Sequence, residues 1–159
     1  MRVIERINIW LGETVAWLYL GAVVVTVWEV IARYVLNAPT AWAFELAIFF
    51  CAVGYLLSGG SVTAREQHIA ITSIFTIAPP VVAWWLRLFG LLVGVFAVGG
   101  LAVASYRSGL HAISIIERTG SAWNAPTPAV IKPLIFVAAV LVLLQLFVQV
   151  VRHFRARMR

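Results

Sequence analysis

Residues 88–106 read L-F-G-L-L-V-G-V-F-A-V-G-G-L-A-V-A-S-Y, which is 19 positions without a charged side chain. At about 1.5 Å per residue, a helix of this length covers roughly 28 Å, close to the hydrocarbon thickness of a bilayer. Residues 46–64 and 133–151 are two further charge-free windows of the same length. The three windows predict three membrane-spanning helices.

A further spanning helix is predicted before residue 36, although the charge-free run there covers only residues 14–28. Trp10 and Trp28 lie 18 positions apart. In a helix this spacing puts them on one face about 27 Å apart, so that one indole can sit in each interfacial belt. No proline interrupts residues 3–36, and we expect this helix to extend past the bilayer. The Glu29–Tyr34 segment that follows offers no signal-peptidase site, so the helix is expected to be retained.

The composition supports this architecture, because 63% of the residues are hydrophobic and only 11% are charged. Soluble domains carry about 25% charged residues. The net charge of +6 does not indicate a nucleic-acid partner, because the arginines lie between apolar segments and at the C-terminus. We therefore predict an all-α membrane protein, a four-helix bundle forming a single integral membrane domain over residues 1–159. The approximate spans are 10–33, 42–64, 82–106 and 129–151.

The positions of the basic residues predict the orientation of the bundle. With the N-terminus in the cytoplasm, eight basic residues fall on the inner side and four on the outer side. The positive-inside rule therefore places both termini in the cytoplasm. The inner set is Arg2, Arg6, Arg65, Arg87, Arg152, Arg155, Arg157 and Arg159, and the outer set is Arg33, Arg107, Arg118 and Lys132.

Three charged residues are candidates for a structural ion cluster in the first hairpin. Glu29 and Arg33 are spaced i,i+4, so they share a helix face and can form a pair. Glu45, early in the second span, is expected to join them across the short turn. The alternative reading is a proton or ion relay, since ionisable groups deep in lipid are often functional. The position of Trp28 in the interfacial belt favours the structural reading.

No catalytic or metal-binding motif is apparent, and we predict that the chain is not an enzyme and holds no cofactor. His68 and His153 are expected on one side of the membrane and His111 on the other, which does not suit a haem between spans. Gly90 and Gly94 form a GxxxG pattern that permits a close helix contact. Gln145 and Gln149 share a face of the last span. Since amides in lipid prefer polar partners, that face is expected to meet protein, either within the chain or in another subunit.

One stretch resembles a known family. Residues 28–45, W-E-V-I-A-R-Y-V-L-N-A-P-T-A-W-A-F-E, resemble the first hairpin of the small membrane subunit of TRAP (tripartite ATP-independent periplasmic) transporters. The family pattern there is R-Y-x-x-N-x-P followed by Trp and Glu. The run from Ile116 to Pro126, together with Gln145, is also similar to one branch of the family. The matching positions in the first hairpin are Arg33, Tyr34, Asn37, Pro39, Trp42 and Glu45.

The loop after the second span matches the family in part. His68 corresponds to the histidine of a Gly-His dipeptide that usually follows a basic residue. This chain departs from the pattern at Gln67, Ala70 and Thr72, where the family has a glycine, a second basic residue and an acid. Any role tied to those charges is therefore not carried over.

The resemblance implies a role in a bacterial inner membrane. The small subunit pairs with a large, multi-spanning, elevator-type subunit that carries the substrate and sodium sites. A periplasmic binding protein delivers an organic acid, typically a carboxylate. The small subunit is expected to widen the static scaffold and anchor it among membrane lipids. We expect its outer segment, with Arg107, Arg118 and Trp123, to lie beside the docking surface for the binding protein.

Two other functions remain open from the sequence. The chain could resemble self-sufficient four-helix multidrug exporters, which use an intramembrane glutamate in the first helix, and Glu13 would then be the residue concerned. Such exporters are often dimers of mixed orientation, which the arginine asymmetry disfavours. A membrane redox or haem subunit is the third alternative, and a Soret band would identify it.

Overall fold

The computed structural model describes residues 2–65 and 79–157 of the chain. Within these ranges it contains helices and no strands, and each of the long helices is long and apolar enough to cross a membrane. The predicted four-helix membrane bundle is confirmed. The helices are α1 (Arg2–Tyr34), α2 (Ala43–Ala64), α4 (Pro80–Ser114) and α5 (Thr127–Arg157).

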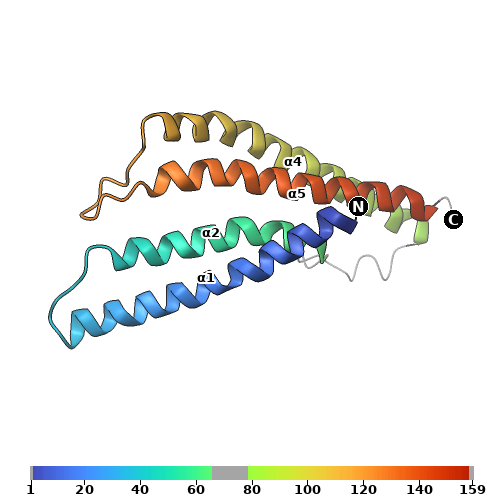
Figure 1. The fold of residues 1–159 in the computed structure, drawn as a ribbon. Coiled ribbons are helices and arrows are strands. Elements are labelled where there is room, and N and C mark those ends of the chain that lie inside the picture. Colours follow the sequence, from blue (N-terminus) through green and yellow to red (C-terminus); the bar gives the residue numbers. More distant parts are fainter. Residues whose placement is uncertain (1, 66–78, 158–159) are drawn as a thin grey trace.

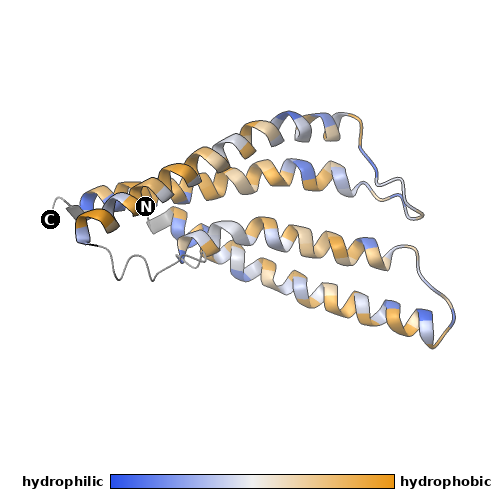
Figure 2. Cartoon of the chain, turned by 180° about the vertical axis from the view of Figure 1, so that it is seen from behind, coloured by the Kyte–Doolittle hydropathy of each residue, from blue (hydrophilic) through white to orange (hydrophobic). Residues whose placement is uncertain are grey.

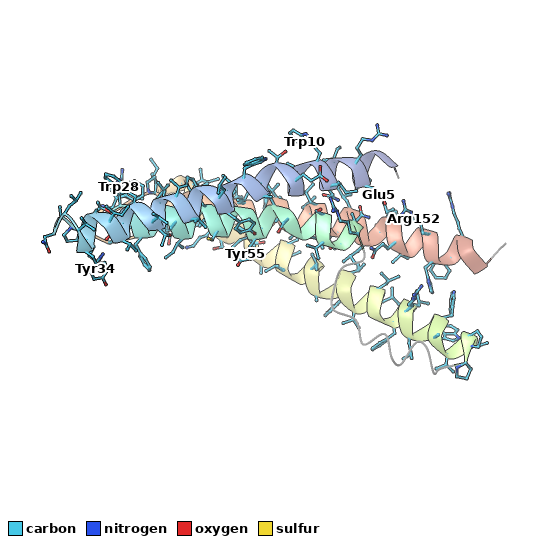
Figure 3. The ribbon with its side chains drawn as sticks, turned by 90° about the horizontal axis from the view of Figure 1, so that it is seen from below. Glu5, Trp10, Trp28, Tyr34, Tyr55 and Arg152 are labelled. Atoms are coloured by element: carbon cyan, nitrogen blue, oxygen red, sulfur yellow. The ribbon has the colours of Figure 1, made fainter. Side chains whose placement is uncertain are left out.

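The helices form two antiparallel hairpins, α1–α2 and α4–α5, which meet mainly where α2 packs along α5 (Figure 1). Both chain termini lie at one end of the bundle, which we call the terminal end. The loops of residues 35–42 and 115–126 lie at the opposite end, which we call the loop end. Helix α4 packs mainly along α5 and diverges from α1 and α2 toward the terminal end (Figure 3).

Helices α1, α4 and α5 extend beyond the expected spans 10–33, 82–106 and 129–151. Helix α1 covers 33 residues and extends beyond the predicted span 10–33 at both ends, as the absence of proline indicated. Helix α4 runs to Ser114, whereas the third span was expected to end at residue 106. A charge such as Arg107 ends a hydrophobic window without ending a helix. Arg107, which was expected in the outer segment, therefore lies on α4, and the loop itself covers residues 115–126.

Helices α4 and α5 approach each other closely near the loop end. Gly109 of α4 faces Pro133, which lies inside α5. A Cβ atom at Gly109 would be 3.0 Å from the Cα atom of Pro133. Glycine therefore allows a backbone approach that would have to loosen to admit a larger residue.

Apolar residues predominate along all four helices (Figure 2), and many of them are exposed. Trp17, Phe44 and Phe96 are 72%, 70% and 85% exposed. Surfaces of this kind occur where lipid or a membrane partner replaces water. Trp10 and Trp28 are also exposed, near the two ends of α1 (Figure 3), which agrees with one indole in each interfacial belt.

The interior contains mainly small side chains, including Ala32, Ala43 and Ala112, together with a few polar ones. Since lipid tails are as apolar as leucine, helices in a membrane associate through close packing and hydrogen bonds. Small residues allow the close packing. The buried polar residues Asn8, Thr63 and Gln145 supply inter-helix contacts that are described below.

Candidate functional site

At the loop end, Glu29 closes the turn between α1 and α2. Its Oε1 atom accepts hydrogen bonds from Arg33, with Nε at 3.0 Å and Nη2 forming the ion pair. Its Oε2 atom accepts from the Thr40 hydroxyl and from the Thr40 backbone N–H at 3.1 Å. The carboxylate thus joins the last turn of α1 to the chain entering α2. Thr40 was missed at the sequence level, although its hydroxyl lies within the motif that carried the family resemblance.

The motif residues after α1 shape this turn. Asn37 adopts a left-handed conformation with φ of 51°, which asparagine tolerates better than most non-glycine residues. The Ala38 backbone N–H then reaches back to the Ala32 carbonyl at 2.9 Å. Pro39 follows, where a helix cannot continue. Tyr34, the last residue of α1, is 75% exposed.

Glu45 does not join Glu29 and Arg33, which corrects the three-membered cluster expected from the sequence. Its carboxylate lies on α2, three residues after Trp42 at the helix start, and accepts hydrogen bonds from Thr119 Oγ1 at 3.1 Å and from Ser121 Oγ. Proximity in sequence suggested Arg33 as the partner. The tertiary structure instead brings the loop between α4 and α5 against the start of α2, so Glu45 joins the two hairpins.

The loop of residues 115–126 is an ordered turn. The Thr119 backbone N–H donates to the Ala125 carbonyl at 3.1 Å, and the Gly120 N–H donates to Asn124 Oδ1 at 3.2 Å. Arg118 Nη1 donates to the Asn124 carbonyl at 3.1 Å. These bonds hold Thr119 and its neighbours in position to meet Glu45.

The remaining charged and aromatic residues of the predicted docking surface are exposed at this end. Arg107 lies on α4 and Trp123 is 43% exposed in the loop. Lys132 of α5 forms an ion pair with Glu117, with Nζ and Oε2 2.6 Å apart. This pair fixes the loop to α5, and the loop end presents a mixed polar surface.

At the terminal end, two buried amides join α1 to α5. Asn8 is 1% exposed and Gln145 is 0% exposed. Asn8 Nδ2 donates to Gln145 Oε1 at 3.4 Å. The partner of Gln145 is therefore internal, and sequence reasoning missed Asn8. Searching for amides on different spans would have identified it, because such groups pair in lipid.

Gln149 also has an internal partner. Its Nε2 atom donates to the Thr63 carbonyl at 2.5 Å, which joins α5 to the last turn of α2. Glu5 and Arg152 form an ion pair at 2.5 Å between α1 and α5 (Figure 3). Three helices thus meet through polar contacts at this end.

The GxxxG glycines differ in their surroundings. A Cβ atom at Gly94 would lie 3.6 Å from Leu146 Cδ1 of α5, whereas Gly90 has no atom within 4 Å of that position. The pattern therefore does not form one continuous contact within this chain. Closer packing occurs at Gly12 and Gly60, where a Cβ atom would collide with Ser61 and Asn8.

Glu13, the residue of the exporter alternative, forms an ion pair with Arg65 at 2.7 Å. Its side chain is 66% exposed, beside a cleft of about 250 Å³ that Gly12, Ala16 and Ser61 also line. This position is near the terminal end of the α1–α2 hairpin. Its partner Arg65 caps the C-terminus of α2, so the ion pair lies within this hairpin.

The histidines are far apart in the described part of the chain. His111 lies in the last turn of α4 and His153 near the end of α5, against Trp84. The predicted motif position His68, and the divergent positions Gln67, Ala70 and Thr72, lie outside the described residues. Within the ranges that are described, no group of three or more His, Cys, Asp or Glu residues could hold a metal ion.

Comparison with protein families agrees with these features. Residues 22–156 match the family model described as "Tripartite ATP-independent periplasmic transporters, DctQ component". The chain belongs to this family. The match includes all of α2 and α4, part of α1 and α5, and both loops of the loop end. No curated protein matches the chain at a significant level. This TRAP small subunit is thus a multi-pass membrane component of a transporter family, and Glu29 and Glu45 lie within the matched region.

Proposed function

We propose that this TRAP small subunit is the accessory scaffold of a sodium-coupled importer of an organic acid, a carboxylate in the simplest case. The family match over residues 22–156 carries the proposal. In this proposal a large, elevator-type membrane subunit holds the substrate and sodium sites. The small subunit holds no cofactor and supports the static part of the large subunit.

The contacts within the chain support a scaffold role. Glu45 fastens the hairpins at the loop end, while Asn8–Gln145 and Glu5–Arg152 fasten α1 to α5 at the terminal end. A bundle tied at both ends moves as one body, as a static support requires. Its exposed apolar surface, for example Phe96 on α4, suits lipid on some faces and a membrane partner on others.

The orientation belongs to the same proposal. The terminal end faces the cytoplasm of a bacterial inner membrane, because eight of the twelve basic residues lie on that side of the sequence-derived topology. The loop end, with Arg107, Arg118 and Trp123, then faces the periplasm beside the docking surface for the binding protein. Single cysteines at Ser121 and at the C-terminus, in a Cys51→Ala background, test the orientation. A membrane-impermeant maleimide added to intact spheroplasts is expected to label only the cysteine at position 121.

Reconstitution tests the function. Proteoliposomes holding this chain and the large subunit, with binding protein and an inward sodium gradient, are expected to accumulate a labelled carboxylate. The large subunit without this chain is expected to transport less, and this chain alone is expected to transport nothing. Robust uptake or drug export by the lone chain, lost in Glu13→Gln, would instead establish the exporter alternative.

A further inference from the structure

Helix α2 has one side that the other described helices leave open. It packs against α1 and against α5. Phe44, Ile48 and Tyr55 lie on a third side, since spacings of four and seven positions place them on one helix face, which we call the α2 face. Their exposed fractions are 70%, 49% and 71%. Tyr55 projects from α2 on the side of the hairpin opposite Trp10 and Trp28 (Figure 3).

Tyr55 lies at the middle of its membrane span. It is the central residue of the charge-free window 46–64, with nine residues on either side. At about 1.5 Å per residue, roughly 14 Å of helix separates it from each end of that window. This distance exceeds the reach of a tyrosine side chain. The hydroxyl therefore cannot extend to the headgroup level, where tyrosine is enriched in membrane proteins.

The Tyr55 ring is held in position by α1. The Tyr19 ring lies directly against Gly54, where a Cβ atom would be 2.8 Å from Tyr19 Cζ. The Tyr55 ring packs edge-on against Tyr19, with centroids 5.5 Å apart. Ser58 interacts with the Tyr19 side chain and donates a 3.1 Å hydrogen bond to the Tyr55 backbone carbonyl. The phenol of Tyr55 is thus a preorganised group, and such tyrosines often carry much of the binding energy at interfaces.

The Tyr55 hydroxyl has no hydrogen-bond partner among the described residues, because the contacts of Tyr55 there use its ring and its backbone carbonyl. Hydrocarbon offers neither a donor nor an acceptor, and an unsatisfied polar group in it costs free energy. A protein group at the same depth can satisfy the hydroxyl, as in other interhelical hydrogen bonds in membranes. Cys51 and Ser58, four positions before and three positions after Tyr55, are small enough to let a further helix approach.

We propose that the α2 face is the contact surface for the large membrane subunit, and that the Tyr55 hydroxyl donates a hydrogen bond to an oxygen atom of one of its spanning helices. The identity of this partner rests on the proposed function, whereas the need for a protein acceptor rests on the depth of the hydroxyl. The outward side of α4 is suited to lipid instead. Phe96 is 85% exposed, lies one residue from the centre of the charge-free window 88–106, and has no polar group.

Photocrosslinking in membranes tests the contact, with the full-length chain co-expressed with the large subunit. A benzophenone side chain at position 55 is expected to crosslink to the large subunit. The same group at position 96, which is similarly deep and exposed, is the matched control and is expected to give no protein crosslink. Crosslinks from position 55 to lipid alone, or to a second copy of this chain, would overturn the proposal while the proposed function stands, provided that the two subunits co-purify. If the unsubstituted chain did not co-purify with the large subunit, the proposed function would fail, and this proposal with it.

Removal of the hydroxyl alone tests the hydrogen bond. Tyr55→Phe is expected to lower the affinity for the large subunit about threefold in lipid nanodiscs, the typical effect of one interhelical hydrogen bond. The Tm of the full-length chain alone is expected to be unchanged. Tyr106→Phe is the matched control and is expected to retain the affinity, because Tyr106 is 50% exposed at the end of the window 88–106, where headgroups and water can meet its hydroxyl. An unchanged affinity in Tyr55→Phe, or an equal fall in both variants, would overturn the proposal.

Discussion

The hydroxyl of Thr119, in the loop between α4 and α5, donates a 3.1 Å hydrogen bond to the carboxylate of Glu45 on α2. Ser121 donates to the other oxygen of the same carboxylate. Thr119 and Glu45 are 74 positions apart in the sequence and belong to different hairpins. This contact makes the loop end one structural unit, in which a residue of the first hairpin fixes the loop of the second.

Replacing Glu45 by alanine is expected to lower the free energy of unfolding by about 1–2 kcal/mol, because two hydrogen bonds to a charged acceptor are lost. Hydrogen exchange at residues 119–125 is expected to accelerate in the same variant. Glu13→Ala is the control, since its ion pair is exposed and such pairs contribute about 0–1 kcal/mol. Unchanged exchange in the loop of Glu45→Ala would contradict the assigned link between the hairpins.

Arg33→Ala is expected to lower the stability of the chain only slightly. If Arg33 paired with both Glu29 and Glu45, the loss would be larger. Glu29 keeps the two hydrogen bonds from Thr40, and Glu45 has partners elsewhere. The Arg33 side chain is 50% exposed, so the loss is expected to be about 1 kcal/mol or less. Thr40→Val is expected to lower the thermal stability more. If Arg33→Ala lowered the thermal stability more than Thr40→Val, the three-membered cluster of Glu29, Arg33 and Glu45 would again be the better interpretation.

The buried amides Asn8 and Gln145 are expected to be strongly coupled. Asn8→Ala leaves Gln145 without its inter-helix bond and is expected to cost about 1–3 kcal/mol. In the double variant with Gln145→Met, which removes both polar groups, the cost is expected to be less than the sum of the single costs. A double-mutant cycle on thermal or denaturant unfolding measures this. Simple additivity would show that the two amides do not interact.

Two glycine substitutions distinguish internal packing from an open face. Gly12→Ala is expected to destabilise the chain by about 1–3 kcal/mol, since the added Cβ would collide with Ser61 of α2. Gly90→Ala, which meets nothing within 4 Å, is expected to change stability by about 0.5 kcal/mol or less. Equal thermal shifts in the two variants would contradict the helix packing described above.

The loop that follows α4 contains a strained residue, and substitution of this residue is expected to relieve the strain. Ile116 has φ of 47°, a conformation that costs a β-branched residue of the order of 1–2 kcal/mol. Ile116→Gly is therefore expected to raise the unfolding temperature. Ile113→Gly, at an exposed helical position three residues earlier, is expected to lower it, because glycine weakens a helix. If the unfolding temperature fell in both variants, the contacts of the Ile116 side chain would stabilise the chain by more than its backbone conformation destabilises it.

The number and type of the helices could be predicted from the sequence. The spans follow from local properties, namely the charge-free windows of 19 residues and the Trp10–Trp28 spacing. An apolar segment of this length matches the bilayer thickness, and in lipid it must form a helix to satisfy its backbone hydrogen bonds. The Glu29–Arg33 pair was also predictable, because i,i+4 neighbours share a face in any helix. The end of α4 at Ser114 was not, since a charge such as Arg107 limits a hydrophobic window and does not end a helix.

The tertiary structure alone decided the partners of the polar residues. Glu45 was expected beside Arg33 and instead meets Thr119, and Gln145 pairs with Asn8, 137 positions away. Local periodicity fixes which face a side chain occupies on its own helix. It does not fix which helix lies opposite, because that depends on how the two hairpins pack. In this chain the sequence by itself determined the spans, and the packing of α2 against α5 decided which residues join them.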